Sequence, residues 1–194
     1  MKRAITAAIF LCAALQAGVA DDEKNFETVR LDDSTALVVR ERVAPPDKDS
    51  PNVRKRLEPT SFFEFILVKN GKESPVEEIS ETGIFSTSSP LQVQTATIAG
   101  DKLCFVYVLY SGSMVAACAT VDPQGGVHMM KETVLEGMSA RSGAGAQFLK
   151  SDTGAPSFKV DWYAGPNKPP ARTTIYKLNA GGEFVKTSEQ PTPP

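Results

Sequence analysis

Catalysis or metal binding by histidine has only one candidate residue in this chain, because His128 is its only histidine. His128 stands between Val127 and Met129 in a segment with strand character. No Gly-x-Ser-x-Gly motif accompanies it, so neither a Ser-His-Asp nor a Cys-His arrangement is indicated. A zinc site is also disfavoured, since such sites draw mostly on histidine and cysteine. We therefore interpret His128 as a partly exposed strand residue, and we expect no metal or other cofactor.

Carboxylates are the remaining source of catalysis, because glycosidases and aspartic proteases need only a pair of them. The candidates are Asp32-Asp33, Glu77-Glu78 and Asp161. Neighbours along a strand point to opposite faces and cannot cooperate directly. A catalytic pair would therefore require residues from distant segments, and no calcium-binding Asp-x-Asp-x-Asp-Gly loop is present.

Two aromatic residues are candidate binding residues. Trp162 is the only tryptophan, and Tyr163 follows it. Both offer flat faces to sugars or protein partners. Alternation along a strand puts Phe158, Val160 and Trp162 on one face and Tyr163 on the other. This pattern favours Trp162 as a core residue, with ligand contact as the alternative.

A short basic cluster, Arg54-Lys55-Arg56, lies in a proline-containing segment from Ala44 to Pro59. We expect this segment to be a long exposed loop. The cluster could bind an anionic polymer or phosphate, or it could simply be solvated. Three acidic neighbours weaken the first interpretation: Asp47, Asp49 and Glu58.

The hairpin within 102–121 carries the clearest local signal. Three-residue hairpin loops typically end in a left-handed glycine, and Tyr110-Ser111-Gly112 fits. In that register Cys104 faces Cys118, and a disulfide is expected. A two-residue Ser-Gly turn would instead put Cys104 opposite Ala119, with the cysteines on different faces. Both faces of this hairpin are apolar, so it should lie centrally in the fold, covered on both sides.

The N-terminus has the layout of a secretory signal peptide at 1–20: Lys2 and Arg3, an apolar run, and a small-residue end at Ala20. The run is too short to span a bilayer, and no transmembrane segment is expected. Cys12 is preceded by leucine and lies early, which disfavours lipidation. We expect a secreted or periplasmic protein, where disulfides persist.

Short runs of β-forming residues bounded by turn residues predict strands along most of the chain. The expected strands are Ala36–Arg40, Phe62–Lys69, Leu91–Ile98, Leu103–Leu109, Met114–Val121, Val127–Lys131, Gln147–Lys150, Phe158–Tyr163, Arg172–Leu178 and Glu183–Lys186. Two stretches look helical: a capping box at Ser74-Pro75-Val76-Glu77, and more weakly Glu132 to Arg141. Gly143-Ala144-Gly145 is interpreted as a flexible connection, and residues 187–194 as a disordered tail.

Together these signals predict a single all-β domain over 21–186, with minor helix, in which an antiparallel meander forms a sandwich or barrel. Residues 105–112 and 158–165 share Phe, Tyr and Gly at matching positions, which suggests degenerate four-stranded repeats of about 53 residues. About three such units fit, fewer than the four or more blades of a closed propeller.

Without residues 1–20 the chain keeps 19 basic and 23 acidic side chains, a formal charge of −4. That balance does not suggest a nucleic-acid partner. We expect an exported, non-enzymatic binding or interaction module of the cell envelope or extracellular space, its partner an unknown protein or envelope component. The alternative is a small secreted or periplasmic hydrolase that uses carboxylates brought together by the fold. The loops Ala44–Pro59 and Gly165–Pro170 are natural contact sites for a partner.

Overall fold

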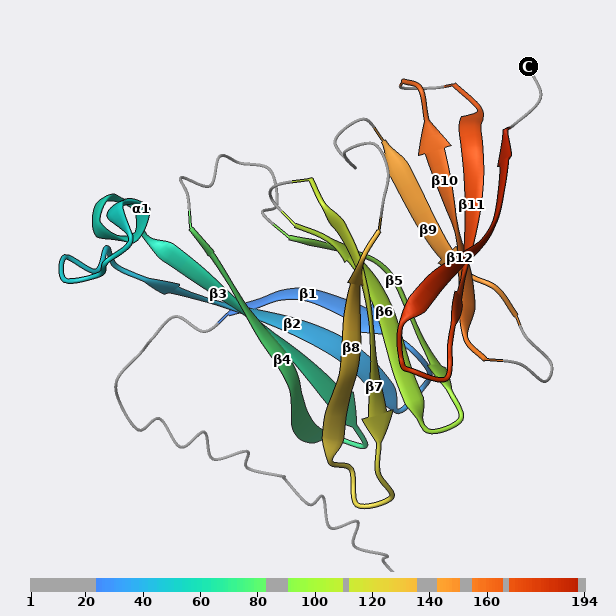
Figure 1. Cartoon of the computed structure of the whole chain (residues 1–194). Helices are drawn as coiled ribbons and strands as arrows, with labels where there is room; N and C mark the ends of the chain where they lie inside the picture. The colour runs from blue at the N-terminus through green and yellow to red at the C-terminus, as the bar shows by residue number, and fades with distance from the viewer. Residues whose placement is uncertain are drawn as a thin grey trace, which may run out of the picture.

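The computed structural model describes residues 24–82, 91–109, 112–135, 143–150, 155–165 and 168–191 (Figure 1). These residues are nearly all β, as predicted: 67% lie in strands and 4% in helix. The predicted signal peptide at 1–20 lies outside them. Within the described ranges, no helix is long and apolar enough to cross a membrane.

The strands form three antiparallel sheets of four strands each, and in every sheet the spatial order follows the chain order. Sheet A contains β1 (Lys24–Arg30), β2 (Thr35–Ala44), β3 (Thr60–Lys69) and β4 (Lys72–Thr82). Sheet B contains β5 (Gln92–Ala99), β6 (Lys102–Val108), β7 (Met114–Val121) and β8 (Val127–Val134). Sheet C contains β9 (Ala144–Phe148), β10 (Ser157–Tyr163), β11 (Pro170–Leu178) and β12 (Phe184–Pro191). None of the sheets closes into a barrel.

The repeated meander is consistent with the predicted repeats. The matching segments, 105–112 and 158–165, include most of β6 and β10, which are the second strands of sheets B and C. In both sheets a glycine pair then precedes the last strand. Sheet A has the same strand order, so all three sheets are four-stranded meanders.

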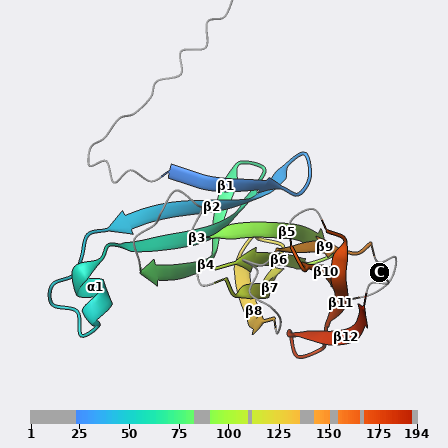
Figure 2. The same cartoon turned by 90° about the horizontal axis from the view of Figure 1, so that it is seen from above.

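Sheet B lies between the other two sheets and is covered on both faces (Figure 2), as the apolar hairpin predicts. Leu103, Phe105 and Tyr107 of β6 pack toward sheet A in one hydrophobic cluster. Cys104 and Val106, which alternate with them, belong to a second cluster with the inward residues of sheet C. The two clusters give the protein two cores that share one central sheet.

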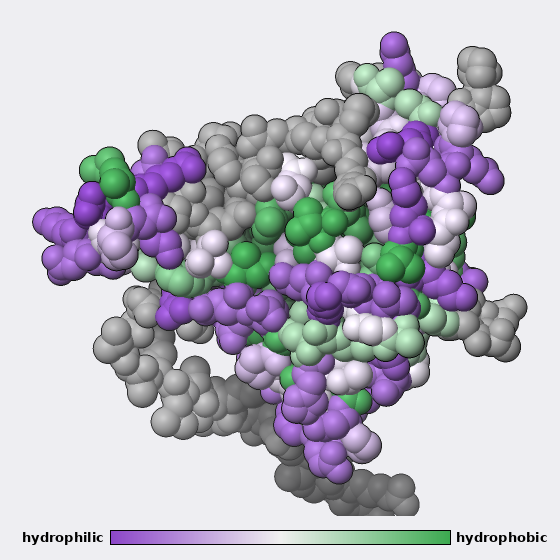
Figure 3. All heavy atoms as spheres, viewed as in Figure 1, coloured by the Kyte–Doolittle hydropathy of each residue, from purple (hydrophilic) through white to green (hydrophobic). Residues whose placement is uncertain are grey.

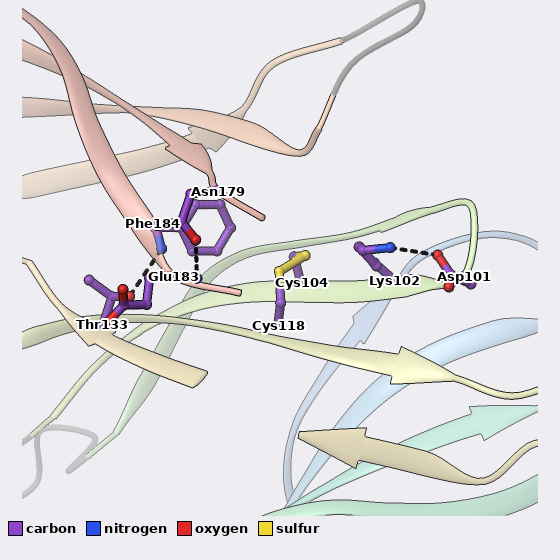
Figure 4. The surroundings of a disulfide bond; sticks show 8 residues. All are labelled: Asp101, Lys102, Cys104, Cys118, Thr133, Asn179, Glu183 and Phe184. Carbon is purple, nitrogen blue, oxygen red and sulfur yellow. Dashed lines mark hydrogen bonds and ion pairs between the residues drawn. A yellow bond between two sulfur atoms is a disulfide. The ribbon is translucent and has the colours of Figure 1, made fainter. Parts of the chain in front are cut away.

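The predicted hairpin register is confirmed. The N–H of Leu109 donates to Ser113 O at 2.9 Å, and Gly112 has a φ of 88°. Cys104 pairs with Cys118 across β6 and β7, and a disulfide joins them inside the B–C core (Figure 4). Both cysteines are fully buried.

Sequence reasoning was wrong about the segment at Ser74, which belongs to strand β4 and not to a helix. Asn70-Gly71 forms the turn from β3, with φ values of 51° and 76°, as a tight two-residue hairpin turn requires. Pairing with β3 over its whole length outweighs the local capping box. Pro75 is tolerated because it stands at a bulge in an edge strand.

Smaller differences follow the same rule that strand pairing outweighs local signals. Strand β1 was not predicted, and the segment expected to be helical from Glu132 continues β8 through Val134, while 136–142 lie outside the described residues. Ala144 and Gly145 open β9 and are not a flexible connection. Strand β12 continues to Pro191, past the predicted end of the domain at Lys186, because it pairs with β11 along that length.

The outer faces of the two flanking sheets carry ion pairs, and on sheet A the Arg42 guanidinium also covers the ring of Phe62. On sheet A, Arg40 contacts Glu73 at 3.0 Å and Arg42 contacts Glu78 at 3.1 Å. On the outer face of sheet C, Lys159 and Asp161 form an ion pair. Polar outer faces of this kind cap a stack of repeats against further growth.

Candidate functional site

The basic cluster lies on a short helix, α1 (Val53–Leu57), within the loop that joins β2 to β3. We call residues 45–59 the α1 loop. It projects from the end of sheet A, well away from sheet C (Figures 1 and 2). The loop is exposed, as predicted, although the helix inside it was not.

The α1 loop is held in one shape by its own hydrogen bonds. Asn52 caps the helix, its side chain accepting from Arg54 N at 2.9 Å. The N–H of Asp47 donates to Lys55 O at 2.9 Å, which ties the start of the loop to the helix. Arg56 donates to Ser50 O at 3.3 Å. The loop is therefore pre-organised although none of its helical residues is buried.

Two apolar side chains on α1 face solvent, and sequence reasoning missed them. Val53 is 59% exposed and Leu57 is 74% exposed. One helical turn separates them, so they lie on the same face of α1. Figure 3 shows a hydrophobic patch over α1, surrounded by hydrophilic side chains of the loop. The spacing Val-x-x-x-Leu around three basic residues was the available signal.

The charges of the loop are unevenly engaged. Arg54 pairs with Glu58 at 3.0 Å, and Asp47 accepts from the N–H of Asp49 at 3.1 Å. The Lys55 side chain makes no hydrogen bond or ion pair with the residues that the structure describes. Lys55 is half-buried and lies two positions from both Val53 and Leu57, so it is on the opposite side of α1 from the apolar face.

The two aromatic candidates point to opposite faces of β10, as the alternation predicts. Trp162 is buried in the B–C core, where its indole N–H donates to Thr174 Oγ1 at 3.2 Å and the Arg172 guanidinium lies over the ring. Tyr163 is half-buried on the outer face of sheet C, packed above Gly143. These residues do not meet the basic cluster on α1.

The carboxylate candidates lie apart from one another. Asp32 accepts from Ser34 in its own turn, which lowers its pKa, and Glu78 pairs with Arg42 on the outside of sheet A. Asp161 accepts from Lys159 and Thr173; these hydrogen bonds outweigh its burial and lower its pKa.

Glu77 is the one candidate that gains a carboxylate neighbour. Burial, and then repulsion from Glu132 of β8, raise the pKa of Glu77. Glu132 accepts a hydrogen bond of 2.7 Å from the hydroxyl of Tyr107. Sheets A and B thus bring a Glu–Glu pair beside a buried tyrosine. The participation of Glu132 could not be foreseen, since it depends on how the two sheets stack.

His128 is exposed, and its Nε2 lies 3.6 Å from Asp122 Oδ2 at the β7–β8 turn. Among the described residues, no group of three or more histidine, cysteine, aspartate or glutamate side chains could hold a metal ion. Comparison with models of known protein families gives no match, and comparison with curated protein sequences gives none either.

Proposed function

We propose that the chain is an exported, non-enzymatic binding module of the cell envelope or extracellular space that docks on a partner protein through the α1 loop. The observation that carries the proposal is the exposure of Val53 and Leu57 on one face of a projecting helix. The all-β fold and the disulfide are compatible with an extracellular location.

The exposed side chains of Val53 and Leu57 contribute little buried apolar surface to the fold. Burying a side chain such as leucine stabilises a protein or complex by about 1.5–3 kcal/mol, and this free energy is unused while α1 faces water. An apolar centre bordered by polar residues is the usual arrangement of a protein–protein contact. Because the loop is already ordered by its hydrogen bonds, binding would lose little conformational entropy.

The charges on α1 define the partner surface further. Arg54 and Arg56 flank the apolar face of α1. Arg54 is already paired with Glu58, so Arg56 is the flanking cation that forms no ion pair with the residues that the structure describes. The complementary surface is a shallow apolar depression bordered by carboxylates. This chemistry describes a protein of the envelope better than a sugar polymer, which would offer hydroxyl groups.

Site-specific crosslinking tests the proposal. A photoreactive phenylalanine analogue replaces Leu57 in one variant and, as a matched control, Val185 in another, because Val185 is also an exposed apolar residue but lies on β12 of sheet C. The proposal expects one discrete protein adduct from position 57 and none from position 185. The adduct should disappear when Arg56→Glu is added.

Two results would argue against docking on a protein. Equal, diffuse labelling from both positions would mean that α1 has no specific contact. Flotation of the protein with anionic phospholipid vesicles, abolished by Leu57→Asp, would assign the loop to a membrane surface instead.

A carboxylate-dependent hydrolase is the second candidate function, and the Glu77–Glu132 pair is the observation that favours it. Two carboxyl groups whose surroundings raise the pKa of one are the usual basis for dividing acid and base roles. Purified protein would be assayed on chromogenic glycosides and peptides. Hydrolysis that is lost in Glu132→Gln but kept in Glu78→Gln would establish a carboxylate-dependent hydrolase. Absence of turnover by the wild type would exclude this function.

A further inference from the structure

A groove lies where the turn end of sheet A meets the turn end of sheet B. The β3–β4 hairpin forms one wall, and the β5–β6 and β7–β8 turns form the other. Its main hollow has a volume of about 580 Å³, and an adjoining hollow measures about 260 Å³. The two hollows share five lining residues: Leu67, Lys69, Val121, Asp122 and Pro123.

The wall formed by the β7–β8 turn is fixed in place. The Lys72 ammonium donates to Gln124 O at 3.0 Å, and the Ser74 hydroxyl donates to Gly125 O at 2.6 Å. Inside the turn, Gly126 N donates to Asp122 Oδ1 at 2.7 Å. The Lys72 and Ser74 bonds join sheets A and B across the groove, so its shape is set before any ligand arrives.

The floor of the groove is apolar. Leu67 lies at its base and is almost fully buried, while Val121 is half-buried. Ile98 of β5 is 36% exposed, which makes it one of the few large apolar residues open to solvent in the described part of the chain. An apolar floor within a hollow of this size is typical of a site for a small organic molecule.

The carboxylates at the groove are already engaged, whereas one cation is not. Asp101 pairs with Lys102 at 2.8 Å, and Asp122 accepts from its own turn and faces His128. Lys69 is exposed and makes no hydrogen bond or ion pair with any residue that the structure describes. It lines both hollows. Lys69 is therefore the cationic side chain of the main hollow that is free to contact an anion.

We propose that this groove binds a small organic anion with an apolar body, such as a medium-chain carboxylate. The carboxylate contacts the Lys69 ammonium, and the apolar body lies on Leu67, Ile98 and Val121. This site is distinct from the α1 loop and does not depend on the function proposed for that loop.

Octanoate and 1-octanol, which have equal chain length, serve as the test ligands for the ¹⁵N-labelled protein that carries residues 21–194. Titration with octanoate should shift the amide resonances of Ile98, Gly100 and Val121, and 1-octanol should bind more weakly. The Lys69→Gln change should weaken octanoate binding about tenfold, since a hydrogen bond to a charged group contributes about 1.5–3 kcal/mol. It should leave 1-octanol binding within about twofold of the wild type.

Lys177→Gln is the matched control, because Lys177 is an exposed strand lysine on sheet C, and it should change neither affinity. Ile98→Ser should weaken both ligands, which separates the apolar contribution from the charge. Three results would overturn the proposal: no shifts at 5 mM octanoate, shifts confined to residues outside the groove, or an octanoate affinity that is the same in Lys69→Gln.

Discussion

Removing the disulfide should lower the free energy of unfolding by an amount that depends on the sequence separation of its two cysteines. Cys104 and Cys118 are 14 residues apart in sequence, and the chain-entropy relation gives about 3 kcal/mol for a loop of this length. In the variant Cys104→Ala/Cys118→Ala two buried sulfur atoms are also lost from the B–C core. That packing loss adds roughly 1 kcal/mol per site.

The assay is urea unfolding followed by the fluorescence of Trp162, which lies in the same core as the disulfide. Three samples are compared: the oxidised protein, the same protein reduced under denaturing conditions and refolded in reductant, and the double alanine variant. Reduction should lower the free energy of unfolding by about 3 kcal/mol. The double alanine variant should lower it by about 5 kcal/mol, because the packing loss at both sites is added. The difference in the free energy of unfolding between the reduced protein and the double alanine variant gives the contribution of packing separately from that of the crosslink.

Two outcomes would refute this reasoning. If reduction changed the free energy of unfolding by less than about 0.5 kcal/mol, the crosslink would not constrain the unfolded chain as the entropy relation requires. If Cys104 and Cys118 reacted with a thiol reagent in the native protein isolated from its oxidising compartment, the bridge itself would be absent.

Three further substitutions test other parts of the account. Trp162→Ala should lower the free energy of unfolding in urea by about 3–5 kcal/mol, because a fully buried indole is lost; a loss below about 1 kcal/mol would contradict its core position. Glu77→Gln should raise stability at pH 7 by less than about 1 kcal/mol, because burial and Glu132 raise the pKa of Glu77 and so penalise its charged form in the fold. This gain should vanish below about pH 4, where the Glu77 carboxyl group is protonated and is as uncharged as the glutamine that replaces it. A gain that persisted in acid would exclude the electrostatic explanation. Gly112→Ala should lower the melting temperature, since a φ of 88° costs a residue with a side chain about 1–2 kcal/mol, whereas Gly165→Ala, where a Cβ meets no atom within 4 Å, should not; equal effects would contradict the turn geometry.

The parts of the fold that could be predicted were those with two independent local signals. The hairpin at 102–121 combines a glycine turn with two cysteines that face each other in only one register. Alternation along β10 correctly predicted that Trp162 points inward. In both cases neighbouring residues determine the geometry, so the sequence contains enough information.

The parts that failed depended on partners far along the chain. The segment at Ser74 carries a genuine helix signal, but pairing with β3 through the Asn70-Gly71 turn satisfies its backbone in a sheet. Strand β1 is short of apolar residues and depends on pairing with β2. Local patterns do not measure the free energy of such long-range pairing.

The candidate sites show the same division. Arg54, Lys55 and Arg56 were recognisable as a cluster, yet the exposure of Val53 and Leu57 depends on α1 projecting from the sheet. The groove at Lys69 forms only because hairpins from sheets A and B end side by side, which no motif encodes.

Native mass spectrometry of the protein gently purified from its source tests the central claim most directly. The wild type should carry a bound protein, and the Leu57→Asp variant, whose change lies on an exposed residue and spares the fold, should appear without it. A partner retained equally by the variant, or a wild-type protein that is always bare, would contradict docking through α1.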